Sequence, residues 1–261
     1  YIVKNHGSII RKISALKNPV NNLYLDSNSI IYDVYRNIPV EGLSKLDYEI
    51  KIYEAISNKI SEYIEKVKPQ DNIFIAFDGV APVAKLEQQR NRRYKSMFER
   101  ELMKKNNPEY KEFGWDQTAI TPGTNFMNNL GDHIRYYFNK NAHRFPQNIM
   151  VSDINDPGEG EHKIFEYIRV NEKTHKNKIT IVYGLDADLI MLALNHLPVS
   201  KGIYLYRETP HFIKTVNSNL NPNEEYMLNI PELANAIADE LSNYRKINDM
   251  QRDNRLYDYI F

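Results

Sequence analysis

Acidic residues recur just after short apolar runs in this chain, and acids placed in this way can bind metal ions together. If the runs are parallel strands, the acids lie at the carboxyl ends of the sheet, where open α/β sheets bind ligands. Several ionised carboxylates repel one another in one crevice unless cations neutralise them. We therefore predict two Mg²⁺ or Mn²⁺ ions, which can activate a water and stabilise the leaving oxygen of a phosphodiester. The predicted ligands and catalytic residues are Asp26, Asp78, Glu159, Glu161, Asp186 and Asp188.

Two other acids in the same region are assigned to turns. Asp153 and Asp156 follow one apolar run, and a single Asp at a strand end usually caps a helix or closes a turn. The Asp-x-Asp and Glu-x-Glu pairs, which recur at the ends of different strands, are harder to explain as caps. The metal-site interpretation is therefore kept for the six acids alone.

A basic segment follows Asp78 and could bind phosphate. The formal net charge of the chain is zero, yet five basic residues and one acid lie between Lys85 and Lys95. On a helix, Lys85, Gln89, Arg92 and Arg93 share one face. Arginine binds two phosphate oxygens at once and lysine adds a point charge. A charge run is usually a solvated face, but its position beside the acids favours a pocket for a terminal phosphate, as in an exonuclease.

The elements that must position these residues alternate between strands and helices. This alternation predicts an α/β fold with a mainly parallel central sheet flanked by helices. Residues 207–230 are predicted as a loop, and Lys104–Glu112 as a mobile connection. The expected strands are Leu23–Leu25, Ile73–Phe77, Ile149–Val151, Ile179–Tyr183 and Ile203–Tyr206. The expected helices are residues 47–67, 83–105, 123–140, 159–170, 187–195, 231–243 and 247–261.

The length of 261 residues suits one α/β domain, with a core over residues 22–206 and a helical extension over residues 231–261. The chain starts without Met and ends within a helical pattern, so we expect trimmed ends. Cysteine is absent, which excludes disulfides and thiolate metal sites. No apolar run reaches the length of a membrane span.

Five motifs, in order over residues 22–194, closely resemble the Xrn/Rat family of 5′→3′ exoribonucleases. They are Leu23-Tyr-Leu-Asp-Ser-Asn-Ser-Ile-Ile31, Phe77-Asp-Gly-Val-Ala-Pro-Val-Ala-Lys85 with Gln89, Arg92 and Arg93, Ile120-Thr-Pro-Gly-Thr124, Pro157-Gly-Glu-Gly-Glu-His-Lys-Ile164 and Tyr183-Gly-Leu-Asp-Ala-Asp-Leu-Ile-Met191.

This resemblance implies a PIN/FEN-like nuclease core that releases nucleoside monophosphates, with Mg²⁺, from single-stranded RNA bearing a 5′-monophosphate. It assigns the six acids to metal binding and Lys85, Gln89, Arg92 and Arg93 to the 5′-phosphate. Asn28 and Tyr32 are also assigned to substrate binding. Tyr32 stands where the family usually has a His that stacks on the terminal base, and a Tyr ring can also stack on a base. The family's opening Met-Gly segment and its downstream Gly-Asn-Asp stretch, which supplies a further metal ligand, are not in this sequence.

Two alternatives remain open. A structure-specific DNA flap nuclease would share the acidic residues, although the motif from Asp78 to Arg93 argues against it. A non-catalytic homologue could bind RNA or act as a scaffold.

His162 could position a substrate group or be structural. We expect an intracellular protein, cytoplasmic or nuclear, and the many Asn, Ile, Lys and Tyr residues hint at an AT-rich genome, such as that of a parasite or large virus.

Overall fold

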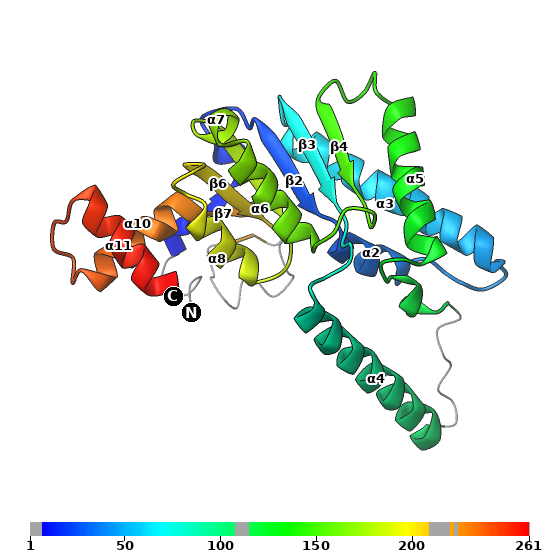
Figure 1. Ribbon diagram of the computed structural model, residues 1–261. Helices are drawn as coiled ribbons and strands as arrows, with labels where there is room; N and C mark the ends of the chain where they lie inside the picture. The colour runs from blue at the N-terminus through cyan, green and yellow to red at the C-terminus, as the bar shows by residue number, and fades with distance from the viewer. Residues whose placement is uncertain (1–6, 108–114, 209–219, 222–223, 261) are drawn as a thin grey trace.

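A computed structural model describes residues 7–107, 115–208, 220–221 and 224–260 of the chain. Over these residues, seven strands form one sheet in the order β1-β7-β6-β5-β2-β3-β4 (Figure 1). The strands are β1 (Ile10–Lys12), β2 (Asn22–Asp26), β3 (Asn72–Ala76), β4 (Asn148–Ser152), β5 (Ile179–Tyr183), β6 (Gly202–Tyr206) and β7 (Tyr226–Asn229).

The five predicted strands are the parallel part of this sheet. β6, β5, β2, β3 and β4 pair in parallel, while β7 pairs antiparallel with β6, and β1 antiparallel with β7. The α/β fold with a mainly parallel sheet is thus confirmed. Chain order runs outward from β2 through β3 to β4, and on the other side from β5 to β6, so the direction of winding reverses between β2 and β5. A ligand crevice is expected at the carboxyl ends beside such a reversal.

Helices cover both faces of the sheet, as Figure 1 shows. Leu23 and Leu25 of β2 belong to a core with α2, α3 and α5, whereas Tyr24 belongs to a second core with α6, α8, α10 and α11. This division follows from the alternation of side chains along a strand. The helices are α2 (Asn28–Tyr35), α3 (Lys45–Val67), α4 (Val83–Asn106), α5 (Asn125–Lys140), α6 (Gly160–Val170), α7 (Glu172–His175), α8 (Asp188–Asn195), α10 (Ile230–Leu241) and α11 (Asp249–Ile260), with 3₁₀ turns η1 (Gly7–Ile9), η2 (Ile13–Ala15) and η3 (Gln117–Ala119).

Local sequence explains where the long helices begin and end. Ser44 precedes α3 and accepts a hydrogen bond from the Asp47 backbone N–H at 3.1 Å, while Lys68 ends the helix with φ at 53°. Thr124 caps α5 through the Met127 backbone N–H at 3.3 Å. Such caps satisfy N–H groups that have no partner within the helix. α4 differs from the other long helices: it extends away from the sheet (Figure 1), and none of its described side chains is buried.

The fold corrects two sequence predictions and adds a helix that was not predicted. The segment 207–230 is not loop throughout, because it contains β7. The many Asn and Pro residues before this strand led to the prediction of a loop. Residues 209–219 and 222–223 lie outside the described residues. The predicted connection Lys104–Glu112 begins within α4, which continues to Asn106, and residues 108–114 again lie outside the described part. Helix α2, directly after β2, was not predicted, and it brings Asn28 and Tyr32 to the carboxyl end of the sheet.

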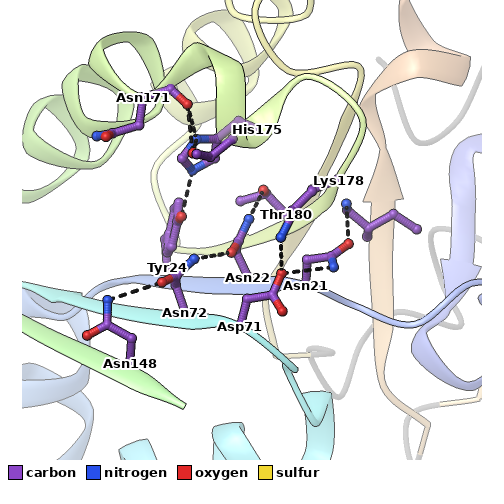
Figure 2. A network of polar contacts seen from close by, with 12 residues as sticks. Asn21, Asn22, Tyr24, Asp71, Asn72, Asn148, Asn171, His175, Lys178 and Thr180 are labelled. Atoms are coloured by element: carbon purple, nitrogen blue, oxygen red, sulfur yellow. Dashed lines mark hydrogen bonds and ion pairs between the residues drawn. The ribbon is translucent and has the colours of Figure 1, made fainter.

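A ladder of amide side chains joins the amino ends of four strands (Figure 2). Asn148 donates to Asn72 at 3.2 Å, Asn72 donates to Asn22 at 2.9 Å, and Asn22 donates to Thr180 at 3.0 Å. Each of these pairs is also a register pair in the sheet. The ladder therefore stabilises one register, and since these strands are short, the register decides which residues emerge together at the carboxyl ends.

None of the helices in the described ranges combines the length and apolar character that crossing a membrane requires.

Candidate active site

The carboxyl ends of the parallel strands surround a cavity of about 560 Å³. Its walls come from the ends of β2, β3 and β5, the starts of α2, α4, α6 and α8, and residues 117–122. All twelve residues that the sequence singled out lie in these walls: Asp26, Asn28, Tyr32, Asp78, Lys85, Gln89, Arg92, Arg93, Glu159, Glu161, Asp186 and Asp188. The structure thus brings the acids and the basic helix face to one place.

Asp78 is held at the end of β3 by three hydrogen bonds. Its Oδ1 accepts from the Gly160 backbone N–H at 2.7 Å, its Oδ2 accepts from Asn28 Nδ2 at 2.6 Å, and its own N–H donates to Asn28 Oδ1 at 3.1 Å. Burial is the main cause that raises the pKa of Asp78, while the Gly160 hydrogen bond opposes it. Asn28 therefore orients an acid as well as lining the cavity.

Asp26 and Glu161 each carry a buried oxygen that nothing in the described structure satisfies. The atoms are Asp26 Oδ1 and Glu161 Oε2. Burial, followed by the charges of Asp78, Glu161 and Asp186, raises the pKa of Asp26 well above its ordinary value. Buried polar atoms are normally hydrogen-bonded, and clustered carboxylates ionise together only beside cations. The donor set, all carboxylate oxygens, fits a hard divalent cation such as Mg²⁺.

Glycines next to these acids permit close approach. A Cβ on Gly160 would lie 2.6 Å from Asp26 Oδ1, and a Cβ on Gly79 would lie 1.9 Å from the Asp156 carbonyl oxygen. Gly79 N–H donates to the Gly158 carbonyl at 2.8 Å, and Gly158 N–H donates to the Val80 carbonyl at 2.9 Å. The loop after β3 and the turn before α6 are thereby joined, so the positions of Asp78 and Glu159 depend on each other.

Glu159 connects the acids to the basic helix. It occupies the residue before α6, and one of its oxygens lies 3.3 Å from Lys85 Nζ. His162 Nε2 lies 3.9 Å from Glu159 Oε2 and 3.9 Å from Glu161 Oε1. Glu159, Glu161 and His162 also have ligand atoms within 4.8 Å of one another. The exposed His162 is therefore near the acids, although the sequence left its role open.

Asp153 and Asp156 make the turn contacts that their sequence assignment predicted. Asp153 accepts from the Asn155 backbone N–H at 2.9 Å and pairs with Arg135 at 2.6 Å. Asp156 accepts from the Ser152 hydroxyl at 2.7 Å. Neither residue lines the cavity.

Sequence reasoning missed part of the cavity wall. Gln117, Thr118, Thr121, Arg36 and Arg100 also line the cavity. The motif beginning at Ile120 was a signal for this segment, but no chemistry could be assigned to it from sequence.

This wall is anchored in the core. Tyr35 OH donates to Gln117 Oε1 at 2.8 Å. The buried Trp115 packs between Tyr35, Tyr48 and Phe126. The segment that carries Gln117, Thr118 and Thr121 is therefore held in place at the cavity wall.

The pKa of Glu161 yields a prediction for the metal-free protein. Burial, then the charges of Asp186, Glu159 and Asp188, raise this pKa from 4.5 to about 7. The folded state therefore holds a proton that the unfolded state has lost, so the stability contributed by Glu161 is complete below pH 4.5 and is lost as the pH rises to about 7. In EDTA, we expect the unfolding free energy of the wild type relative to Glu161→Gln to fall by at most about 2 kcal/mol between pH 5 and 7.5. The difference in Tm between the two proteins follows this fall.

The comparison with Glu161→Gln is needed because buried histidines act in the opposite direction. Burial lowers the pKa of His133, His175 and His196, so their contribution rises with pH over the same range. These contributions are shared by both proteins and cancel in the difference. A difference in Tm that stays constant with pH would contradict the raised pKa of Glu161.

Comparisons with known proteins agree with the family that the five motifs resemble. The family model described as "XRN 5'-3' exonuclease N-terminus" matches residues 1–209. The chain is 36% identical over 215 residues to 5′-3′ exoribonuclease 2 of Schizosaccharomyces pombe, covering 72% of this chain and 21% of that protein. It is 39% identical over 219 residues to 5′-3′ exoribonuclease 2 of Arabidopsis thaliana, covering 73% and 21%. The chain thus spans about a fifth of these relatives.

Among solved structures, the catalytic core of Rad2 in complex with DNA substrate matches 88% of this chain and 55% of that chain, with 14% identity and a TM-score of 0.44.

Proposed function

Because the chain belongs to the XRN 5′-3′ exonuclease N-terminus family, we propose that this protein is a 5′→3′ exoribonuclease acting on single-stranded RNA that ends in a 5′-monophosphate. The observation that carries the proposal is that one cavity joins the six acids to the basic face of α4. The acids suit phosphodiester cleavage, and the basic face suits a terminal phosphate that defines where cleavage starts.

The acids would hold two divalent cations, Mg²⁺ or Mn²⁺. Asp26 and Glu161 offer oxygens with no other partner, and Asp78 is oriented by Asn28 and Gly160. Glu159, Asp186 and Asp188 complete the ring of carboxylates in the cavity wall. Bound cations supply a water of lowered pKa and neutralise charge on the leaving oxygen.

The chain's own residues would select and orient the RNA end. Arg92 and Arg93 can each donate two hydrogen bonds to a phosphate, and Lys85 adds charge from the first turn of α4. Tyr32 presents a ring on which the terminal base can stack. Residues 117–122 line the same cavity as the basic residues of α4, so a cap or triphosphate would need space within walls that both segments form.

We predict that the full-length protein shortens 5′-monophosphate RNA in the presence of Mg²⁺ and releases nucleoside monophosphates. Matched RNAs with a 5′-hydroxyl or a 5′-triphosphate should react at least about 10-fold more slowly, since each charge-assisted hydrogen bond to phosphate contributes about 1.5–3 kcal/mol. Gel and chromatographic analysis of the three RNAs measures both the rate and the product.

The same assay tests the alternatives. Equal rates on all three RNA ends would contradict the phosphate pocket, and faster cleavage of a 5′-flap DNA would favour a structure-specific DNA nuclease. Binding of the RNAs without any cleavage would favour a scaffold protein. EDTA-treated protein is the negative control.

A further inference from the structure

A buried lysine lies directly behind the acidic cavity. Lys163 is on α6, two residues after Glu161, and is 8% exposed. Its Nζ donates to the Phe77 carbonyl at 2.8 Å and to the Asp153 carbonyl at 2.7 Å. In the described ranges of the chain, no ion pair joins it to a carboxylate, and it does not line the cavity.

Burying this ammonium group without a carboxylate partner lowers the stability of the fold. Lysine is almost never fully buried without a charged partner, and both acceptors here are neutral backbone carbonyls. The nearby carboxylates of Asp156, Asp78 and Asp153 attract its charge from a greater distance. Packing alone could be achieved by an apolar side chain of similar length, so the two hydrogen bonds distinguish Lys163 from a core residue.

The two acceptors identify what Lys163 holds together. Phe77 immediately precedes Asp78, and Asp153 begins the loop that leads to Glu159. Lys163 itself is on the helix that carries Glu161, and α6 packs against β2 and β3 (Figure 1). One ammonium group therefore connects the three segments that present Asp78, Glu159 and Glu161.

We propose that Lys163 is a positioning residue, which fixes the spacing of these three acids for divalent-cation binding without contacting the cation. The inference rests on the metal site of the proposed function. Groups that orient metal ligands typically change metal affinity or activity by about 10- to 100-fold when they are mutated.

The sign of the effect separates positioning from simple charge balance. If Lys163 acted only through its charge, its removal would leave the acids more negative and the cation would bind more tightly. If it acts by holding the two carbonyls, its removal lets the acid-bearing loops move and the cation binds more weakly. Because Lys163 does not face the cavity and donates to both loops, positioning should dominate.

The test uses Mn²⁺ alone as the probe, titrated by calorimetry into the full-length protein with Lys163→Met. We expect the Kd for Mn²⁺ to rise by about 10-fold or more, and the Mg²⁺ concentration that gives half-maximal activity to rise by a similar factor. KM for 5′-monophosphate RNA at saturating Mg²⁺ should stay within about twofold of the wild type, because Lys163 is remote from the substrate.

Lys178→Met is the matched control, since Lys178 pairs with Asp71 at the amino ends of the strands (Figure 2), far from the cavity. It should leave Mn²⁺ affinity unchanged. Lys163→Leu, which removes both the charge and the donor, replaces the Met variant if that protein does not fold. Unchanged or tighter Mn²⁺ binding by a folded Lys163 variant would overturn the inference, whereas a wild-type protein that binds no Mn²⁺ would overturn the proposed metal site itself.

Discussion

Asp26→Asn should lower the rate of RNA shortening by about 10³-fold at saturating Mg²⁺. Asp26 lies at the end of β2, between β5 and β3, and its Oδ1 is buried with no hydrogen-bond partner. An amide removes an anionic ligand, and the stabilisation that a bound metal gives a transition state is several kcal/mol, with each 1.36 kcal/mol equal to a factor of ten. Single-turnover rates on 5′-monophosphate RNA with the full-length protein measure the loss.

The same substitution should stabilise the metal-free protein. Burial and the neighbouring acids raise the pKa of Asp26 well above its ordinary value, so its ionised form destabilises the fold at neutral pH. In EDTA at pH 7.5 we expect the Tm of Asp26→Asn to exceed that of the wild type by roughly 2–4 °C, the shift that about 1 kcal/mol produces at this size. Loss of activity together with gain of stability would mark Asp26 as a residue kept for function.

Asp156→Asn is the control for Asp26→Asn. Asp156 lies outside the cavity wall and accepts from the Ser152 hydroxyl, a bond that an Asn oxygen can also accept. This variant should keep activity within about threefold, because a surface-loop change away from the site usually costs less than about 0.5 kcal/mol. Equal activity of Asp26→Asn and wild type would remove Asp26 from the metal site.

The parallel sheet could be predicted from sequence because its signals are local. The five strands are short apolar runs that helical patterns separate from one another. Strands buried on both faces of a sheet need such continuous apolar residues. β7 had no such signal. Tyr226–Asn229 follows a segment rich in Asn and Pro, and it becomes a strand because β6 offers an open edge and β1 pairs on its other side.

The acids of the site could also be predicted, since residues at the carboxyl ends of neighbouring parallel strands necessarily meet. The relations between loops could not be predicted. The bonds that join Gly79 to Gly158, and Lys163 to the Phe77 carbonyl, depend on two segments meeting that lie about 80 residues apart in the sequence. Asn28 likewise bonds to Asp78 only because β2 and β3 are adjacent. Sequence therefore predicted which groups would bind ligands, and the structure adds what orients them.

The acids and the basic helix face have separate tasks, and they can be separated by experiment. The acids alone indicate metal and phosphate, as they would in many nucleases. In the proposed function, the choice of a 5′-monophosphate end depends on α4, which lies apart from the cores and has no buried side chain among its described residues. Substitutions on α4 should therefore alter end selection with little effect on folding.

Arg93→Ala should reduce kcat/KM for 5′-monophosphate RNA by about 10- to 100-fold, the effect of losing charge-assisted hydrogen bonds of about 1.5–3 kcal/mol. Arg93 is exposed and lines the cavity, so the loss should come from substrate recognition and leave Tm unchanged. The slower reaction of 5′-hydroxyl RNA should be nearly unaffected, because that RNA has no terminal phosphate to bind. The ratio of the two kcat/KM values is the quantity to measure.

Arg90→Ala is the matched control, because Arg90 is an exposed arginine on the same helix but is not in the cavity wall. It removes the same charge at a similar place in the sequence and should keep the preference for 5′-monophosphate RNA. If both variants lost the preference equally, α4 would act through general attraction of RNA, which weakens with salt. If Arg93→Ala slowed both RNAs to the same extent, Arg93 would contact the RNA body, and the terminal phosphate would have to be bound elsewhere in the cavity.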